Sequence, residues 1–213
     1  MTIYMKKITK YIPLPLNIAI IVFGIIGFKM NMGYGTDTLR YYTVLSNLFA
    51  LITSAVYVVW YIVSKGKLPV FITYLRYTAT VCLTLTFLVV TFVFVPMSGN
   101  FKVLLEGVNL YQHLLCPAIS FVSFLFFENK ERLAKRHVFL SLIPTFTYAA
   151  VIIVLNILRV VVGPYPFLMV YKQSAAESVM WFFIINGMAF ATASLLMIPM
   201  FVRKKKGGVT DEN

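Results

Sequence analysis

The sequence predicts an all-α integral membrane protein, in which six transmembrane helices form one bundle and both termini lie in the cytoplasm. The first observation is composition: 60% of the 213 residues are hydrophobic, 12% are charged, and the mean hydropathy is +0.86. A soluble domain is about 25% charged, so this chain has too few polar side chains to face water all round. The second is length, because several apolar runs reach the roughly 20 helical residues that cross a hydrocarbon layer. The third is the placement of the basic residues between those runs.

Six apolar runs are separated by short segments that contain glycine, proline or charged residues. The predicted spans cover about residues 12–28, 41–63, 77–95, 108–127, 137–158 and 178–202. They are expected to be helices, because hydrocarbon offers no hydrogen-bond partners to an open backbone. A β-barrel would need alternating runs of about ten residues, and residues 81–95 do not alternate. With no second domain or repeat, residues 1–213 are expected to form a single transmembrane domain.

The basic residues predict the orientation. Of the 19 Lys and Arg residues, 14 lie in the amino-terminal segment, the loops after the second and fourth spans, or the tail. This count assigns Arg76 to the loop after the second span. The other five lie on the opposite side. Because basic residues concentrate in cytoplasmic loops, we expect a multi-pass protein of the plasma membrane. The amino-terminal lysines precede an apolar run as in a signal peptide, but no clear cleavage site follows, which favours an uncleaved first helix.

The net charge of +12 could suggest binding to nucleic acid. The basic residues form short clusters between apolar runs and not a stripe along one helix face, so we expect membrane lipids as partners and no nucleic acid. Cys82 and Cys116 both fall inside apolar runs, without a CxxC spacing. We therefore expect no disulfide, no metal site and no cofactor.

Ionisable residues inside a membrane are candidates for function. All seven acidic residues fall outside the predicted spans, so a proton-coupled transporter would have no evident relay. His113 is the remaining candidate, since it lies about five residues into the fourth span. Asn109 is one helical turn before it and Gln112 is adjacent.

The second span begins on the same side of the membrane as His113. Thr43, Ser46 and Asn47 are spaced i, i+3, i+4, so they share one helix face and should point into the bundle. Thr43 and His113 thus enter from one side at similar depth. A hydroxyl beside an imidazole is the minimal arrangement for nucleophilic acyl transfer. Two simpler roles stay open: Thr43 could bond a carbonyl of its own helix, and His113 could be a hydrated interfacial residue.

Other residues allow competing interpretations. Cys116, three residues after His113, could be the nucleophile of an acyltransferase or a packing residue. Tyr165, between two prolines, could belong to an interfacial aromatic belt or to a cavity lid. Asparagines also lie within the spans, where they could line a polar path or bridge helices; these are Asn17, Asn156 and Asn186.

Three segments carry a family resemblance: Tyr-Thr-Val-Leu-Ser-Asn-Leu at 42–48, His-Leu-Leu-Cys-Pro at 113–117 and Tyr-Pro-Phe-Leu at 165–168. In this order on a six-span frame, the sequence resembles the androgen-induced, FAR-17a-like family, especially its small bacterial relatives. The resemblance implies a membrane threonine hydrolase that cleaves fatty acid esters of hydroxy fatty acids. It also implies that Thr43 is the nucleophile and His113 the general base.

The expected function is therefore hydrolysis of lipid (fatty acyl) esters at a site in the outer leaflet. Asn47 and Tyr165 are the expected donors to the oxyanion, and further positioning candidates are Ser46, Asn109 and Gln112. The alternative is a non-enzymatic lipid-binding, sensor or small-molecule transport protein, for which internal symmetry would be the signal.

Overall fold

The structure is a computed structural model that describes residues 11–128 and 133–207, with only the backbone described for 201–207. These residues form helices and connecting segments, without a β-strand in the described ranges. Six helices are long and apolar enough to cross a membrane. Several residues used to predict the orientation lie outside the described ranges: Met1, Lys6, Lys7, Lys10, Lys130, Arg132 and Asn213.

The first three spans are α2 (Pro13–Met32), α3 (Tyr42–Val63), and α4 (Val70–Val89) extended by the π-helix η2 (Val90–Phe94) and α5 (Val95–Ser98). The fourth combines α6 (Gly107–Asn109), the π-helix η4 (Leu110–Leu115), α7 (Cys116–Ser123) and the π-helix η5 (Phe124–Glu128). The last two are α8 (Arg136–Leu140) with α9 (Ile143–Ile157), and α10 (Ala175–Gly207). Short 3₁₀ helices occupy three connections: η1 (Thr36–Arg40), η3 (Phe101–Leu105) and η6 (Pro166–Leu168).

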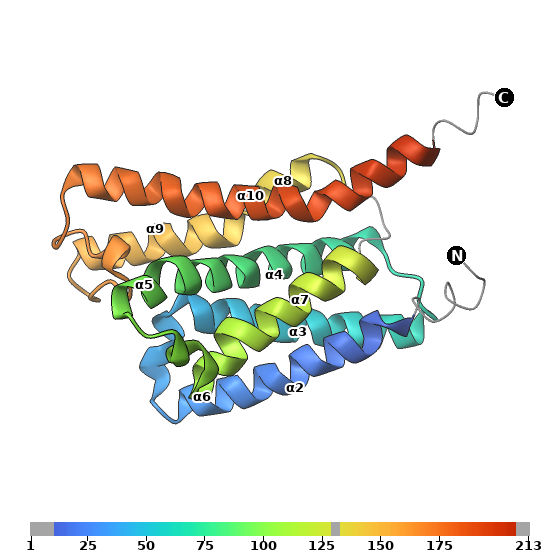
Figure 1. Cartoon of the computed structure of the whole chain (residues 1–213), viewed down its shortest axis with the longest axis horizontal. Helices are drawn as coiled ribbons and strands as arrows, with labels where there is room; N and C mark the ends of the chain where they lie inside the picture. The colour runs from blue at the N-terminus through green and yellow to red at the C-terminus, as the bar shows by residue number, and fades with distance from the viewer. Residues whose placement is uncertain (1–10, 129–132, 208–213) are drawn as a thin grey trace.

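The long helices lie side by side along the long axis of the molecule (Figure 1). The connections 33–41, 99–106 and 159–174 all lie at the left-hand end of that view, and α2 begins and α10 ends at the opposite end. This alternation agrees with an even number of spans. Large apolar side chains also face outward along these helices, including Val59 at 62% exposure and Phe183 at 68%. Such an apolar exterior is suited to lipid, where a soluble protein would show charges.

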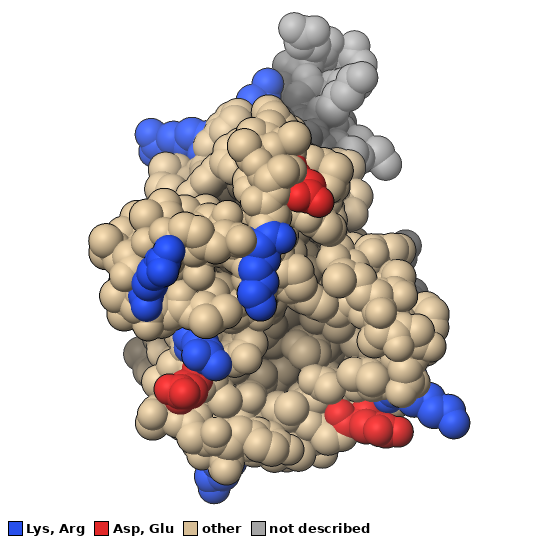
Figure 2. Space-filling view, turned by 90° about the vertical axis from the view of Figure 1, so that its left-hand side faces the viewer, with Lys and Arg blue, Asp and Glu red and all other residues tan. Residues whose placement is uncertain are grey.

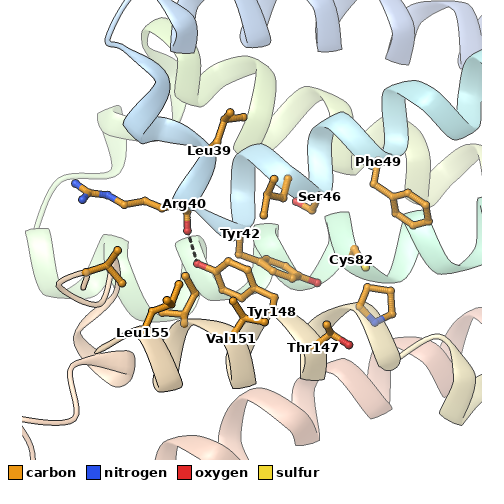
Figure 3. A pocket seen from close by; sticks show the side chains of 14 residues that line it. Leu39, Arg40, Tyr42, Ser46, Phe49, Cys82, Thr147, Tyr148, Val151 and Leu155 are labelled. Atoms are coloured by element: carbon orange, nitrogen blue, oxygen red, sulfur yellow. Dashed lines mark hydrogen bonds between the residues drawn. The ribbon is translucent and has the colours of Figure 1, made fainter. Parts of the chain in front are cut away.

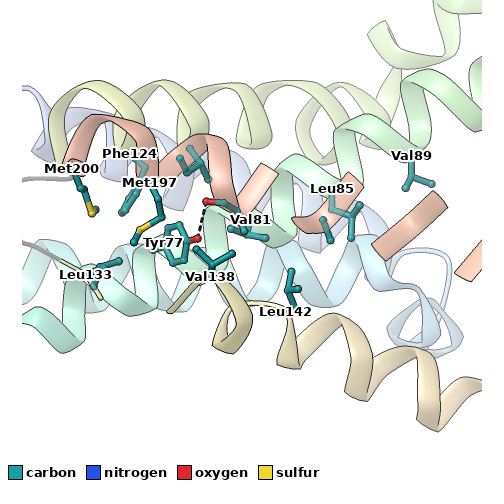
Figure 4. Close-up of a cluster of buried hydrophobic side chains, with 13 residues drawn as sticks. Tyr77, Val81, Leu85, Val89, Phe124, Leu133, Val138, Leu142, Met197 and Met200 are labelled. Carbon is teal, nitrogen blue, oxygen red and sulfur yellow. Dashed lines mark hydrogen bonds between the residues drawn. The ribbon is translucent and has the colours of Figure 1, made fainter. Parts of the chain in front are cut away.

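A cluster of apolar side chains joins α4 to η5, α8 and α10 (Figure 4). Tyr77, Val81 and Leu85 of α4 contribute one side, and Leu196 and Met197 of α10 contribute another. The Tyr77 hydroxyl donates to the Ala193 carbonyl at 2.8 Å, which satisfies the phenol inside the cluster. The cluster fixes α10 against α4 mainly by apolar contacts.

The predicted fifth span is interrupted. Pro144 has no amide hydrogen and therefore leaves the Leu140 carbonyl without its helical donor. The chain turns at Ser141 and Leu142 between α8 and α9. The Tyr74 hydroxyl donates to the freed Leu140 carbonyl at 3.3 Å, so a side chain of α4 replaces the missing backbone bond.

The sequence prediction is wrong for two charged residues. The apolar pattern assigns Arg76 to a loop, but α4 begins at Val70, and Arg76 is fully buried within it. The same pattern puts Glu128 outside the spans, but it ends η5 inside the bundle at 4% exposure. The two form a salt bridge, with Arg76 Nε 3.0 Å from Glu128 Oε2. Each charge therefore lies in the bundle because the other neutralises it.

Five polar side chains complete what we term the ion-pair network. Besides Arg76 and Glu128, it contains Asn17 of α2, Ser54 of α3, Thr80 of α4, and Ser120 and Ser123 of α7. Arg76 donates to Ser54 at 3.0 Å and to Ser120 at 3.2 Å, in addition to the carboxylate. Glu128 Oε1 accepts from Asn17 at 2.8 Å and from Ser123 at 2.5 Å. Four spans thus meet at one pair of charges.

The sixth span begins earlier than predicted, at Ala175 in place of about residue 178. Ser174 and Glu177 form a capping box: the Ser174 amide donates to Glu177 Oε2 at 2.7 Å, and the Glu177 amide donates to Ser174 Oγ at 3.2 Å. These reciprocal bonds satisfy two amides of the first turn. Glu177 is therefore part of the helix start and not of the loop.

Candidate functional site

The polar face of α3 points into the bundle, as its spacing predicts. Thr43, Ser46 and Asn47 are 9%, 4% and 3% exposed. Ser46 donates to the Thr43 carbonyl at 3.0 Å and shares a 3.0 Å hydrogen bond with Thr86 of α4. Ser46 therefore joins α3 to α4, which is a structural role.

Asn47 joins α3 to the fourth span. Its side-chain nitrogen donates to the Thr43 carbonyl at 2.9 Å and to the Gln112 carbonyl at 3.0 Å. Gly27 of α2 allows the same region to close, because a Cβ there would lie 2.9 Å from Gln112 Cγ. These contacts hold the residue before His113 against the start of α3, so η4 packs beside α3.

His113 lies in a π-helix for a local reason. Pro117 follows it by four residues and has no amide hydrogen, so the His113 carbonyl loses its α-helical donor. The backbone responds by widening into η4 over Leu110–Leu115. Such π segments occur frequently at functional sites. The spacing of His113 and Pro117 indicates a π-helix, but the sequence analysis predicted a regular α-helix over this span.

Tyr165 reaches Thr43 from the connection between α9 and α10. Its hydroxyl lies 3.3 Å from the Thr43 amide and 3.4 Å from the Thr43 hydroxyl. The ring stacks on Phe167, with centroids 5.3 Å apart, and is 9% exposed. The side chain is therefore packed inside the bundle against Thr43, whereas a residue of an interfacial belt would face outward.

Gly163 permits the tight path of that connection. A Cβ at this position would lie 2.5 Å from the Leu168 carbonyl oxygen, so any larger residue would shift the backbone. Burial raises the pKa of the Tyr165 phenol above its ordinary value. The phenol is therefore protonated at neutral pH and can donate a hydrogen bond.

No direct hydrogen bond joins the Thr43 and His113 side chains in the described ranges, and the link between their helices is the bond from Asn47 to the Gln112 carbonyl. Within the described ranges, the Thr43 hydroxyl has Tyr165 as its side-chain partner, and His113 Nδ1 is buried without a partner. A contact through one water stays a prediction. We term Thr43, Ser46, Asn47, Gln112, His113 and Tyr165 the threonine cluster.

Three atoms of the threonine cluster are buried without a hydrogen-bond partner among the described residues. They are Asn47 Oδ1, Gln112 Nε2 and His113 Nδ1. A buried polar atom without a partner costs about 1–3 kcal/mol, so three together indicate a site that a ligand could satisfy. They also change the assignment of oxyanion donors. Both hydrogens of Asn47 are used by carbonyls, whereas Gln112 Nε2 is a free donor.

A cavity of about 580 Å³ lies beside the threonine cluster, between α3 and α9 (Figure 3). Ser46 lines it, and Tyr42 and Tyr148 lie next to each other in its wall with ring centroids 5.1 Å apart. Tyr42 shares a 2.7 Å hydrogen bond with Thr145, and the Tyr148 hydroxyl donates to the Arg40 carbonyl at 2.8 Å. The remaining lining is mainly apolar, which suits an acyl chain. The sequence did not predict that these tyrosines form one wall of a cavity, because only the packing of α9 against α3 brings them together.

The other candidate residues lie outside the threonine cluster. Cys116 is 1% exposed and packs with Ile20 and Leu83, which supports the packing role. Asn109 ends α6 half-buried, without a side-chain hydrogen bond to another described residue. His137, the other histidine of the chain, is half-buried and lies against the Tyr74 ring at 5.1 Å.

Asn17, Asn156 and Asn186 all have hydrogen-bond partners within the protein. Asn17 joins the ion-pair network, and Asn156 bonds the Val161 carbonyl and the Val170 amide. Asn186 donates to the Phe182 carbonyl of its own helix. These contacts favour bridging over a polar path. The described residues contain no cluster of His, Cys, Asp or Glu that could hold a metal ion.

The fold and site define a class: an α-helical bundle with six membrane-compatible spans and a buried polar cluster near one end. Comparisons with family models, with curated proteins and with solved structures find no match.

Proposed function

We propose that this protein is a membrane-embedded hydrolase of lipid esters, with Thr43 as nucleophile and His113 as general base. The observation that carries the proposal is the unpartnered His113 Nδ1, which is buried and follows Gln112, whose carbonyl shares the Asn47 side chain with the Thr43 carbonyl. The adjacent 580 Å³ cavity offers space for an acyl chain. Esters of hydroxy fatty acids are the substrate class that the resemblance to the androgen-induced family indicates.

The reaction proceeds through an acyl-threonine. His113 takes the hydroxyl proton of Thr43 while the Thr43 oxygen attacks the ester carbonyl carbon. The tetrahedral intermediate expels the alcohol, which receives the proton from His113. Water then attacks the acyl-threonine, His113 takes a proton from that water, and the Thr43 oxygen regains a proton as the fatty acid leaves.

Two donors could stabilise the oxyanion. Gln112 Nε2 is unpartnered, and the protonated Tyr165 phenol lies next to the Thr43 oxygen. Preorganised donors of this kind contribute about 2.7–4 kcal/mol each to transition-state stabilisation. Productive binding requires the substrate carbonyl to replace the present Tyr165–Thr43 contact, so the connection that carries Tyr165 acts as the lid.

The orientation belongs to the same proposal. We place both termini in the cytoplasm and the threonine cluster toward the outer leaflet of the plasma membrane, on the basis of the basic-residue bias. Single cysteines introduced at Gly99 and at the carboxyl-terminal tail, with Cys82 and Cys116 replaced by serine, test this by labelling of intact cells. Residue 99 should label with an impermeant maleimide, and the tail should label only after permeabilisation. The reverse pattern would contradict the orientation.

The activity is tested with purified protein and a panel of lipid esters in detergent. Thr43→Val removes the hydroxyl and keeps the shape, so turnover should be abolished. His113→Ala should be comparably severe, because nucleophile and base act as a unit. Cys116→Ser should retain activity, which separates this enzyme from a cysteine acyltransferase. Wild-type turnover in Thr43→Val would contradict the proposal.

One observation favours a second candidate, a non-enzymatic lipid-binding or transport protein. The 580 Å³ cavity is lined by Ser46 but by neither Thr43 nor His113. A protein that only holds an acyl chain would need the cavity and not the hydroxyl. It would bind lipid equally well as wild type and as Thr43→Val, without cleaving any ester.

A further inference from the structure

A second cavity, of about 370 Å³, lies where α9 ends and the connection to α10 returns. Arg159 and Lys172 contribute its charged lining, and Val161, Val162 and Met169 contribute apolar walls. Figure 2 looks onto this end of the molecule and shows Lys and Arg side chains distributed over it. None of the residues of the proposed reaction lines this cavity, although the 580 Å³ cavity next to it is the one proposed above for the acyl chain of the ester.

The cavity is positively charged without local compensation. No carboxylate lines it, and neither Arg159 nor Lys172 forms a salt bridge with an acidic residue in the part of the chain that the structure describes. The Arg159 guanidinium carbon lies 5.0 Å from the centre of the Tyr171 ring. The ring orients the guanidinium, because cation–π contact favours one placement. Two uncompensated cations at one cavity, one of them oriented by a ring, form a site for an anion.

Hydrogen bonds fix the floor of the cavity. Asn156 is 6% exposed, and both ends of its side chain are used: Nδ2 donates to the Val161 carbonyl at 2.9 Å, and Oδ1 accepts from the Val170 amide at 2.9 Å. These bonds tie the end of α9 to both sides of the connection. They hold the segments that carry Arg159 and Lys172 at a fixed separation.

The charged cavity lies next to the apolar one. Val161 lines both the 370 Å³ cavity and the 580 Å³ cavity between α3 and α9. The larger cavity also meets the exterior of the bundle, because its lining residues Leu45 and Val151 are 38% and 51% exposed. Arg40 is a third cation at the edge of this combined space. An anion site that leads into an apolar groove fits an amphiphile, whereas a water-soluble anion would leave the groove unused.

We propose that this combined site binds an anionic phospholipid, with the headgroup phosphate at Arg159 and Lys172 and one acyl chain between α3 and α9. The shared wall at Val161 is the point where headgroup and chain meet. The lipid would place a chain beside Ser46 and thereby close the groove next to the threonine cluster.

Native mass spectrometry of the purified full-length protein tests the proposal. The protein is titrated with phosphatidylglycerol and with phosphatidylcholine of identical chains. A cation near a membrane surface contributes about a fivefold preference for an anionic lipid. Wild type should therefore prefer phosphatidylglycerol, and Arg159→Gln and Lys172→Gln should each lower its affinity about fivefold. Their affinity for phosphatidylcholine should not change.

Lys102→Gln is the matched control, because Lys102 is an exposed cation in η3 and lines neither cavity. It should leave both affinities at the wild-type value. Glycerophosphoglycerol, the headgroup without chains, should compete poorly. Equal affinity for the two lipids, an equal loss in Lys102→Gln, or full competition by the free headgroup would each overturn the proposal.

Discussion

The ion-pair network and the threonine cluster are both buried polar groups in the same bundle, but they differ in hydrogen bonding. In the former, Arg76 and Glu128 use their charged atoms on each other and on Ser54, Ser120, Ser123 and Asn17. In the latter, three atoms on Asn47, Gln112 and His113 are buried without partners in the described ranges, whereas the ion-pair network has one such atom, Asn17 Oδ1. A network whose charged atoms are all paired specifies structure, whereas several unsatisfied atoms together are tolerated where a ligand supplies the missing partners.

The largest expected effect is from breaking the ion pair. Glu128→Ala leaves Arg76 buried without its counter-charge, which should cost about 3–5 kcal/mol of stability. The double variant Arg76→Met/Glu128→Leu removes both charges and should recover most of this loss. Thermal unfolding in detergent, followed by circular dichroism, measures both. Asp37→Ala, at an exposed carboxylate in η1, is the control and should be neutral. A double variant as unstable as the single would contradict the role of the pair.

Gly163→Ala should have the next largest effect. Its Cβ would meet the Leu168 carbonyl oxygen at 2.5 Å, so the connection must shift, at about 1–3 kcal/mol. Tyr165 and Phe167 would move with it, and Phe167 packs on Trp181 at 5.6 Å. Trp181 fluorescence, recorded in a Trp60→Phe background, should therefore change. Gly187→Ala is the control, because nothing lies within 4 Å of its Cβ position. A similar change in both would refute the lid role of this connection.

Tyr165→Phe isolates the hydroxyl. The ring contacts with Phe167 and Phe94 stay, and the bonds to Thr43 are lost. Loss of one buried hydrogen bond should cost about 1 kcal/mol, measured by the same unfolding experiment. If the phenol donates to the oxyanion, the rate constant for ester cleavage should fall while KM changes little. Unchanged turnover would leave Gln112 as the remaining donor candidate.

Gln112→Met should change stability least. Together with Ser120→Ala it compares the threonine cluster with the ion-pair network directly. Its Nε2 has no partner to lose, so stability should be unchanged or slightly higher. Ser120→Ala, in the ion-pair network, removes a partner of Arg76 and should cost about 1–3 kcal/mol. Equal losses in the two variants would mean that both clusters are structural.

The spans could be predicted from sequence because apolar length is a local property. The start of the third span could not be predicted in this way, because a charged residue inside an apolar run is usually taken as the boundary of a span. The run on both sides of Arg76 was the available signal, and its partner Glu128 lies 52 positions away. Only packing brings the two together, so no local pattern identifies the pair.

The candidate site, like the spans, could be predicted where it depends on local sequence and not where it depends on packing. The inward face of Thr43, Ser46 and Asn47 follows from helical spacing and is confirmed by burial. The π-helix at His113 follows from Pro117, four residues later, once the missing amide is considered. The contact between Tyr165 and Thr43 spans 122 positions and depends on the fold of the α9–α10 connection, so the sequence could name Tyr165 but not its partner.

The most direct measurement is covalent labelling of Thr43. An active-site-directed fluorophosphonate, incubated with the purified protein, should modify residue 43 in wild type and in Cys116→Ser, as located by peptide mass spectrometry. Thr43→Val and His113→Ala should stay unlabelled, because one lacks the oxygen and the other the base. Absence of label in wild type, or label at Thr43 that persists in His113→Ala, would contradict the assignment of these two residues as a catalytic pair.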